Sequence, residues 1–246
     1  MIPAEPDFTR YTRQIMLPEW GAAGQARLQA ATVLVAGAGG LGSPAALYLA
    51  AAGVGRLRIC DRDHVELTNL NRQILHPADR LGHAKAASAQ QTLAAINPTI
   101  VVEAVEAALD EQNVDQIAAG VDLIVDCLDN YPTRRALNRH SVLRRIPLVH
   151  GAVSGMYGQL SFFHPPATGC LACLIPGDPP QSPQPEPAVG AVCGLVGSLQ
   201  ALEAIKFLLG MEATLKNRLL SVDGFDLAFE TFELKRAPAC PVCGAA

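Results

Sequence analysis

The stretch Thr32-Val-Leu-Val-Ala36, followed at once by Gly37-Ala-Gly-Gly-Leu-Gly42, decides the fold of this chain. A short apolar run that ends in glycines is typical of a buried parallel strand, and Ser43–Ala52 then has the composition of a helix. A strand, a G-x-G-x-x-G turn and a helix form the context in which such glycines bind a nucleotide. The glycines allow a tight turn and bring backbone N–H groups to phosphate oxygens at the positive end of the helix. Taken alone, the pattern favours NAD or FAD, and the glycines expected at the nucleotide are Gly37, Gly39, Gly40 and Gly42.

Strands and helices alternate up to about residue 155. We expect strands at Leu57–Cys60, Thr99–Val105, Leu123–Cys127 and Pro147–Val153. Helices are expected at Asp7–Met16, Glu19–Ala30, His83–Ile96, Glu111–Ala119 and Pro132–Arg144. This alternation predicts an α/β fold with a Rossmann-like, doubly wound sheet that is parallel in its N-terminal half.

The pattern changes after Gly155. Gln159–Phe163 is a strand candidate with no helix before it, which indicates antiparallel pairing, and Pro165–Pro187 is a proline-rich loop. An apolar helix is expected over Gly190–Leu209, where Glu203 and Lys206 argue against a membrane span. Two more strands, at Arg218–Val222 and Leu227–Leu234, complete a sheet with antiparallel strands added in its C-terminal half.

Composition excludes several classes of protein. Half of the 246 residues are hydrophobic, so the chain can bury a sizeable core. The formal charge is −4 and no Lys/Arg run occurs, which argues against nucleic acid or an anionic membrane surface as partner. The N-terminus lacks an apolar signal core, so we expect a cytoplasmic protein.

Polar residues follow the second strand of the expected sheet. Asp61 ends that strand, where a carboxylate can accept hydrogen bonds from ribose hydroxyls. Arg72 and Lys85 come shortly after it. Each alone is readily explained as a solvated surface cation. Together, and with a divalent metal, they would offset the about four negative charges of ATP, more than a nicotinamide cofactor presents.

A second acidic segment, Asp126-Cys-Leu-Asp129-Asn130, ends the next core strand. Ligands of open α/β sheets bind at the carboxyl ends of the strands, so Asp129 is a candidate Mg²⁺ ligand there. Its alternative role is the N-cap of the helix that begins near Pro132. Among the histidines, His64, His76 and His83 are expected at the surface or at caps, and His150 in the core.

The seven cysteines fall into two classes. Cys60, Cys127 and Cys193 lie in apolar surroundings, as buried small hydrophobic residues do. The remaining four form two C-x-x-C pairs with good spacing for a closed, structural Zn²⁺ site, although a redox role is the alternative. The zinc ligands would be Cys170, Cys173, Cys240 and Cys243.

In combination, these motifs closely resemble the MoeB/ThiF/HesA family of ubiquitin-activating-type adenylyltransferases. The resemblance rests on Arg10-Tyr-x-Arg13-Gln14, the glycine loop, Asp61-x-Asp63, Asn69-Leu-Asn-Arg72-Gln73, Lys85 and Asp126-Cys-x-Asp129-Asn130. It implies a homodimer that binds ATP, with Asp61 on the ribose, Asn69, Arg72 and Lys85 around the phosphates, Asp129 on Mg²⁺, and Arg13 reaching the phosphates of the other subunit. The nucleotide site would also include Asp63, Thr68, Leu70, Asn71, Gln73 and Asn130.

The resemblance further implies a substrate, the C-terminal glycine carboxylate of a ubiquitin-like sulfur-carrier protein of the MoaD/ThiS type that ends in Gly-Gly. Such a carboxylate has a pKa of about 3.5, so it is ionised at neutral pH and needs no general base. We expect one domain over 1–246, with a nucleotide-binding half over 1–155 and a carrier-binding and zinc half over 156–246. The alternatives are another carboxylate, of a peptide precursor or a tRNA-linked group, and NAD-dependent oxidoreduction.

The chain departs from part of the family at one position. Some members carry a cysteine in the loop before the Gly190 helix, and register places that position near Pro183. Cys193 lies further along and is expected to be structural. We therefore expect adenylation without covalent transfer to this chain, and a separate sulfurtransferase as the source of sulfur.

Overall fold

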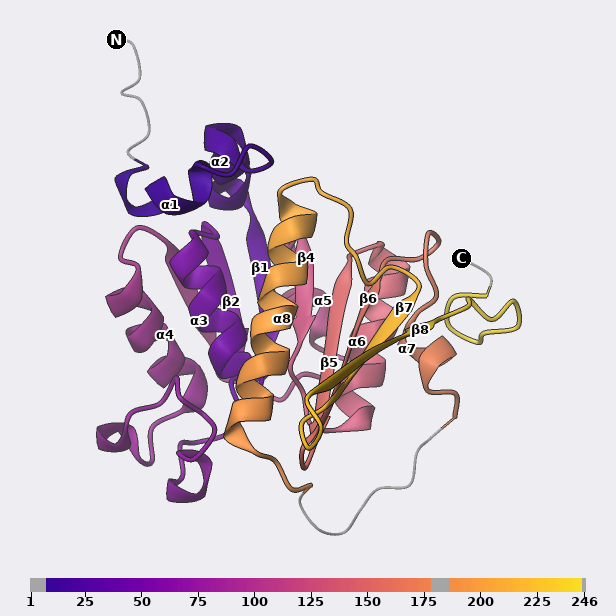
Figure 1. Cartoon of the computed structure of the whole chain (residues 1–246). Helices are drawn as coiled ribbons and strands as arrows, with labels where there is room; N and C mark the ends of the chain where they lie inside the picture. Colours follow the sequence, from indigo (N-terminus) through magenta and orange to yellow (C-terminus); the bar gives the residue numbers. More distant parts are fainter. Residues whose placement is uncertain (1–7, 178–185, 245–246) are drawn as a thin grey trace.

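The computed structural model describes residues 8–177 and 186–244, and an eight-stranded sheet runs through it in the order β3-β2-β1-β4-β5-β6-β7-β8 (Figure 1). The first five strands are parallel, and the last three are antiparallel, as the sequence predicts. Their bounds are β1 Thr32–Ala36, β2 Arg56–Cys60, β3 Val101–Val105, β4 Leu123–Asp126, β5 Leu148–Ser154, β6 Tyr157–Phe163, β7 Arg218–Asp223 and β8 Ala228–Glu233.

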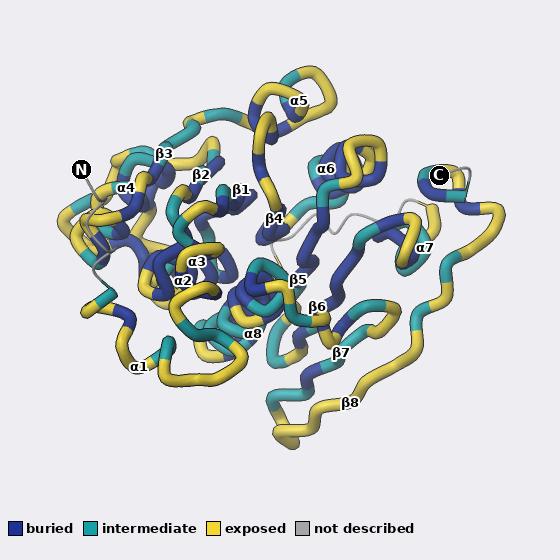
Figure 2. Tube along the Cα trace, turned by 90° about the horizontal axis from the view of Figure 1, so that it is seen from above, coloured by how far each residue is buried: buried dark blue, intermediate teal, exposed yellow. Residues whose placement is uncertain are grey.

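Helices cover both faces of the parallel half (Figure 2). One face carries α3 (Gly42–Ala52), α4 (Lys85–Ile96) and α8 (Gly190–Leu208), and the other carries α5 (Val114–Ile117), α6 (Tyr131–Arg144) and α7 (Leu171–Leu174). Two further helices, α1 (Thr12–Ile15) and α2 (Gly21–Ala30), lie beyond the amino ends of the strands. Short 3₁₀ turns occur at Thr9–Tyr11, Leu67–Asn69 and Ala78–Arg80.

The pleat of β1 divides the core in two. Val33 and Val35 point into the cluster that α3 and α8 cover, whereas Leu34 and Ala36 point into the cluster beneath α6. Since successive side chains of a strand face opposite ways, a strand that is apolar at every position is buried on both faces. This is why the run at 32–36 is predictable from its composition.

Helix α8 is the one helix among the described residues that is long and apolar enough, by length and composition, to cross a membrane. It packs against α3 and against β5 and β6. A Cβ at Gly197 would lie 2.4 Å from the Leu41 carbonyl oxygen, so the glycine permits the close approach of α8 to the start of α3. The helix is thus part of the core of this fold.

Three expected elements differ from the structure. The first helix, expected over 7–16, is a 3₁₀ turn followed by the four-residue α1, because Tyr11 turns inward and its hydroxyl bonds to Asn97. The helix expected at Glu111–Ala119 is also only four residues long, because Asp110 and Asn113 hold the preceding residues in a side-chain-capped turn. Within the expected proline-rich loop, Leu171–Leu174 forms α7.

Candidate active site

The glycine loop lies between the carboxyl ends of β2 and β4. Gly37 has φ +96, and a Cβ there would lie 2.7 Å from the Cys127 carbonyl oxygen. A Cβ at Gly42 would lie 1.9 Å from the Gly37 carbonyl oxygen, so the turn excludes any side chain at this position. The Gly37 N–H donates to the Cys60 carbonyl oxygen over 2.8 Å. The loop is therefore a backbone cradle that only glycine can build, as nucleotide binding at a helix start requires.

Asp61 is bonded to this loop. Its Oδ2 accepts from the Ala38 N–H over 2.7 Å, and its Oδ1 accepts from the Asp63 N–H over 2.8 Å. Burial raises the pKa of Asp61, although the two backbone hydrogen bonds and the charge of Lys85 oppose that shift. Because each carboxylate oxygen keeps a further lone pair, Asp61 remains able to accept a ligand hydroxyl.

Lys85 is a buried cation at the same edge of the sheet. It is the first residue of α4, and its side chain is only 7% exposed. Its Nζ lies 3.3 Å from Asp63 Oδ2, and its N–H donates to the Asp63 carbonyl oxygen over 2.8 Å. Lys85 is therefore not a solvated surface residue. The acidic group paired with its charge, Asp63, is exposed.

The turn over 66–73 presents amide and guanidinium groups beside the loop. Asn69 completes a capping box with Glu66. Arg72 donates through Nη1 to the Thr68 carbonyl oxygen and to Asn71 Oδ1, both over 3.0 Å. Leu70 is half-buried within the turn.

Gln73 ends that turn and carries an unpaired polar atom. The residue is 4% exposed, its Nε2 lies 3.6 Å from the Cβ position of Gly39, and its Oε1 is buried without a hydrogen-bond partner in the described protein. A buried oxygen without a partner is costly unless a ligand satisfies it. The orphaned oxygen and the glycine cradle together fit a bound nucleotide.

His76 hydrogen-bonds to the backbone of the glycine loop. The expectation that His76 lies at the surface or at a cap is therefore wrong. It is buried, with Nε2 2.8 Å from the Ala38 carbonyl oxygen and Nδ1 3.0 Å from Ser88 Oγ. Burial lowers its pKa, so the neutral ring donates through Nε2 to Ala38 and accepts from Ser88 through Nδ1. A single sequence carries no signal for this role, since it depends on how residues 61–84 turn back beneath the loop.

Asp129 and Asn130 follow β4, and Asn130 rather than Asp129 caps α6. Asn130 Oδ1 accepts from the Thr133 N–H over 3.0 Å, so the alternative role of Asp129 as the N-cap is wrong. Asp129 is exposed, and its Oδ1 accepts from Asn130 Nδ2 over 3.3 Å. An exposed carboxylate at the carboxyl edge of the sheet has the donor chemistry that Mg²⁺ prefers.

Arg13 does not join the other candidate residues within one chain. It is exposed on α1, and its neighbour Gln14 donates to the Ala52 carbonyl oxygen at the end of α3 over 2.8 Å (Figure 1). The glycine loop is at the start of α3, and a helix of 11 residues is about 16 Å long. The structure thus separates Arg13 from the glycine loop of its own chain.

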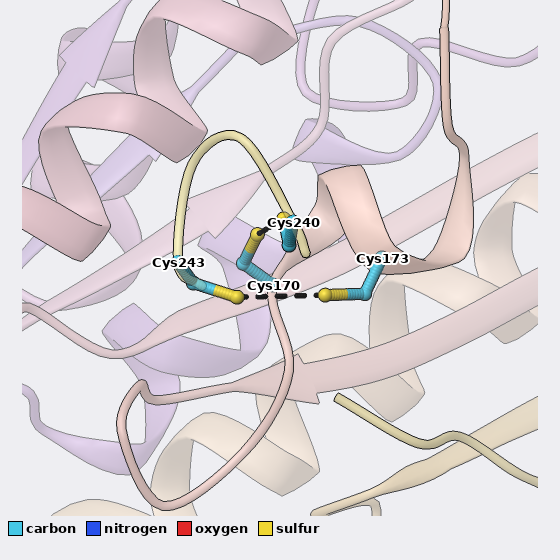
Figure 3. Close-up of side chains that lie close together, drawn as sticks. All are labelled: Cys170, Cys173, Cys240 and Cys243. Carbon is cyan, nitrogen blue, oxygen red and sulfur yellow. Dashed lines mark hydrogen bonds between the residues drawn. The ribbon is translucent and has the colours of Figure 1, made fainter. Parts of the chain in front are cut away.

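The two C-x-x-C pairs meet although nearly seventy residues separate them (Figure 3). Cys170 Sγ lies 3.8 Å from Cys240 Sγ, Cys173 Sγ lies 3.4 Å from Cys243 Sγ, and all four sulfur atoms lie within 4.8 Å of one another. Tetrahedral zinc with Zn–S bonds of about 2.3 Å requires sulfur atoms about 3.8 Å apart.

Polar groups donate to sulfur atoms of this cluster, whereas burial, which the charge of a bound metal would oppose, raises the pKa of Cys170 and of Cys243. Asn138 Nδ2 donates to Cys170 Sγ over 3.6 Å, and the Ala237 N–H donates to Cys173 Sγ over 3.5 Å. Burial alone would raise the pKa of Cys240, but backbone hydrogen bonds from Cys243 and Val242 outweigh it and lower the pKa to about 7. These residues fit a closed zinc site with no coordination position left open.

Comparison with known proteins assigns the chain to a family. The model of the ThiF family matches residues 11–242. The SAMP-activating enzyme E1 of Haloferax volcanii is 45% identical over 239 residues, which cover 96% of this chain and 88% of that protein. The sulfur carrier protein adenylyltransferase of Thermus thermophilus is 43% identical over 247 residues, which cover 97% of this chain and 91% of that protein.

Among solved structures, that of E. coli MccB with ATP has a TM-score of 0.86 and 24% sequence identity, and the match covers 96% of this chain and 74% of that one. At this identity the likeness supports the fold alone. The family match and the two relatives carry the assignment further: the chain belongs to the ThiF family and is an enzyme of the adenylyltransferase type.

Proposed function

We propose that this enzyme transfers AMP from ATP to the C-terminal glycine carboxylate of a small ubiquitin-like sulfur carrier, of the MoaD/ThiS type, with release of pyrophosphate. The observation that carries the proposal is the convergence of the glycine loop, buried Lys85 and exposed Asp129 at one edge of the sheet. A dinucleotide oxidoreductase needs the glycine loop but has no use for the cation and the carboxylate beside it. The relatives named for carrier activation support the substrate class.

In this proposal ATP lies with its phosphates over the glycine loop. Asp61 and Asp63 hold the ribose side, and Lys85 and Arg72 offset phosphate charge, while a ribose hydroxyl or the adenine amino group would donate to Gln73 Oε1. Asp129 would hold Mg²⁺, which when bound supplies further positive charge to the phosphates. Thr68, Asn69, Leu70 and Asn71 of the turn over 66–73, and Asn130 at the start of α6, would complete the nucleotide site.

The chemistry needs positioning and charge rather than a base. The incoming carboxylate is already ionised at neutral pH, so it attacks the α-phosphorus directly, the bond to the β-phosphate oxygen breaks, and pyrophosphate leaves. Lys85 and Arg72 stabilise charge that accumulates on the transferring phosphoryl group. The buried Lys85 acts at short range in a low dielectric, where each such contact is worth more than in water.

We propose a homodimer in which Arg13 of one subunit completes the site of the other. Support comes from its exposed position at the far end of α3 from its own loop. Exposed apolar side chains, Met16 and Leu17 just after α1 and Tyr48 on α3, suit a protein interface.

We assign residues 1–155 to nucleotide binding and 156–246 to carrier binding and zinc. The second half exposes four aromatic side chains on or beside its antiparallel strands, and β8 at the edge of the sheet is exposed along its length (Figure 2). The rings of Tyr157 on β6 and Phe225 after β7 lie with their centroids 5.7 Å apart and tilted by 56°, and Phe229 and Phe232 are half-exposed on β8. An exposed edge strand that carries aromatic side chains between its polar ones suits a folded protein substrate. Zn²⁺ at the four cysteines would tie the C-terminal tail to α6 and α7 as a structural clip.

Sulfur would come from a separate sulfurtransferase. Cys193 is 3% exposed against the glycine loop, and burial raises the pKa of its thiol, which disfavours the thiolate that a nucleophile needs. The loop position near Pro183, where some relatives carry a cysteine, lies outside the described residues. We propose a cytoplasmic enzyme, in keeping with seven free thiols in the described protein.

Exchange of labelled pyrophosphate into ATP tests the proposal. We expect exchange that requires Mg²⁺ and a carrier ending in Gly-Gly, and that disappears when the last glycine of the carrier is deleted. Exchange that proceeds equally well with the truncated carrier, or that is stimulated only by a different carboxylate, would contradict the carrier assignment.

A further inference from the structure

A cluster of charged and polar side chains is buried directly beneath the segment that carries Asp129. Its members are Asp126 at the end of β4, Arg134 on α6, His150 on β5 and Gln200 on α8. Arg134 is 5% exposed and the other three are fully buried. Burying a charge costs free energy unless ion pairs and hydrogen bonds offset the loss of water. The contacts within this buried polar cluster therefore indicate what it does.

The cluster holds both backbone polar groups of Leu128, the residue before Asp129. The Leu128 N–H donates to Asp126 Oδ1 over 3.1 Å. The Leu128 carbonyl oxygen accepts from Arg134 Nη2, which also donates to the Gly151 carbonyl oxygen over 2.8 Å. Arg134 is itself held by the Asp126 carboxylate, with Nε 3.5 Å from Oδ1. Side chains thus hydrogen-bond to both the N–H and the carbonyl group of Leu128, the residue directly before Asp129.

His150 fixes the other oxygen of that carboxylate. Its Nδ1 lies 2.7 Å from Asp126 Oδ2. Burial lowers the pKa of His150, so its ring is neutral and donates through Nδ1. Burial alone would raise the pKa of Asp126, but the charge of Arg134 and the hydrogen bond from His150 outweigh it and keep the carboxylate ionised.

Two features indicate that His150 does more than fill space. Its Nε2 is buried without a hydrogen-bond partner in the described protein, so the ring carries a desolvation penalty that an apolar side chain would avoid. The position is also coupled to the nucleotide loop: Ala36, which precedes Gly37, pairs with Asp126, and Asp126 pairs with His150 across adjacent strands. Gln200 Nε2 adds a bond from α8 to the Asp126 carbonyl oxygen over 2.7 Å.

We propose that His150 and Arg134 are positioning residues for Asp129: acting through the Asp126 carboxylate, they fix the Leu128 peptide and so hold the Asp129 carboxylate where it meets Mg²⁺·ATP. The proposal rests on the proposed function for the role of Asp129, but its structural part stands without any ligand. Removing the His150 hydrogen bond frees one oxygen of Asp126, lets that carboxylate rotate away from Leu128, and loosens the segment over 128–130.

The first test uses hydrogen exchange of the ligand-free enzyme in three variants. His150→Leu removes the donor to Asp126, whereas His150→Asn replaces it with an amide N–H at the same distance along the side chain. His140→Leu is the matched control, because His140 is also buried, is also paired to an aspartate (Asp115, 2.9 Å) and also has an unpaired Nε2, but lies away from Leu128. We expect faster exchange at 128–130 in His150→Leu alone. Unchanged exchange at 128–130 in His150→Leu, or an equal increase in exchange there in His140→Leu, would overturn the proposal.

The second test measures ATP affinity by calorimetry with and without Mg²⁺. We expect His150→Leu to reduce the Mg²⁺-dependent gain in ATP affinity by about 10–100-fold, as loss of a supporting partner of a metal ligand does, while metal-free affinity stays unchanged. His150→Asn should restore the gain. An equal loss of affinity with and without the metal would contradict positioning through Asp129. A wild-type enzyme that binds no Mg²⁺·ATP would contradict the proposed function instead. The hydrogen exchange of residues 128–130 would then decide whether His150 positions this segment.

Discussion

Side chains at the carboxyl edge of the sheet differ in how firmly the protein holds them. Asp61 and Lys85 are bonded into the glycine loop and its neighbouring turn, so their replacement disturbs local structure as well as any ligand. Asp129 is exposed and contacts only the side chain of Asn130 among the bonds described. Its replacement should therefore affect chemistry with little effect on folding.

Asp129→Ala tests that difference. We expect pyrophosphate exchange to fall by at least about a hundredfold, because one charged ligand of the metal is lost, while the melting temperature and the zinc content remain those of the wild type. Exchange assays, thermal unfolding and metal analysis on the same preparation provide the measurements. Retained exchange would remove Asp129 from the site.

Two glycines of the loop should respond differently to an added methyl group. A Cβ at Gly40 would lie 3.0 Å from Cys193 Sγ, whereas a Cβ at Gly42 would lie 1.9 Å from the backbone oxygen of Gly37. We expect Gly40→Ala to weaken ATP binding and Cys193→Ala to restore it, because that change removes the crowding sulfur. No change at Cys193 should rescue Gly42→Ala. ATP titrations of the single and double variants decide this, and a failed rescue would show that Gly40 is needed for direct approach to phosphate instead.

The C-terminal tail has little apolar support. It meets the body through a small cluster around Cys170, Cys240 and Cys243, with Val142 of α6. A metal at the four sulfur atoms would supply the stability that such a small cluster lacks.

Zinc removal should therefore loosen the tail. We expect one zinc ion per chain in the wild type. Cys173→Ser should lose the zinc and unfold at a lower temperature. In a protein of this size the melting temperature falls by about 2–4 °C for each kcal/mol of stability that is lost. Cys60→Ala is the control, because Cys60 is buried between strands far from the cluster in sequence and should leave zinc bound. Full zinc content in Cys173→Ser would contradict four-cysteine ligation.

The strands were predictable, and three of the helical elements were not, for a physical reason. β1 and β4 are buried on both faces and almost wholly apolar, and a glycine turn marks the end of β1 and an acidic residue the end of β4. The short α5 depends instead on side-chain bonds between Asp110 and Asn113, which compete with helix formation in a way that composition does not reveal.

The same contrast holds at the candidate site. Asp61 and Asp129 follow parallel strands, and the carboxyl ends of parallel strands share one edge, so their placement at that edge was predictable. His76 and Arg134 were missed as supports because their contacts, with the Ala38 and Leu128 carbonyl oxygens, depend on the path of a long turn and on the rotation of α6 about its axis.

For the whole molecule, the separation of Arg13 from its own glycine loop makes the subunit arrangement testable. Arg13→Ala and Asp129→Ala should each inactivate the enzyme. In a mixed dimer one site contains both native residues and the other contains neither, so co-expressed, doubly tagged heterodimers should recover about half of the wild-type activity. If Arg13 acted within its own chain, every site of the mixed dimer would be defective and no activity would return.

The stability of the whole molecule should also fall in mild acid. Burial lowers the pKa of His76, His140, His150 and His164. The unfolded chain therefore binds protons at these groups near pH 6.5, whereas the folded chain binds them only at lower pH, so stability present above about pH 6.5 is lost as the pH falls. Urea unfolding from pH 7.5 to 5.5 should show this decline, with a shallower slope in His140→Asn. A free energy of unfolding that is constant or rises over this range would contradict it.

The central claim concerns the bond that the enzyme forms, and intact-mass spectrometry of the carrier tests it most directly. After incubation with enzyme, Mg²⁺, ATP and pyrophosphatase, the account predicts a carrier heavier by one AMP, with the added mass on the C-terminal glycine and lost on treatment with a small thiol. A carrier of unchanged mass, or one that carries phosphate in place of AMP, would contradict adenylation of the carrier carboxylate by this enzyme.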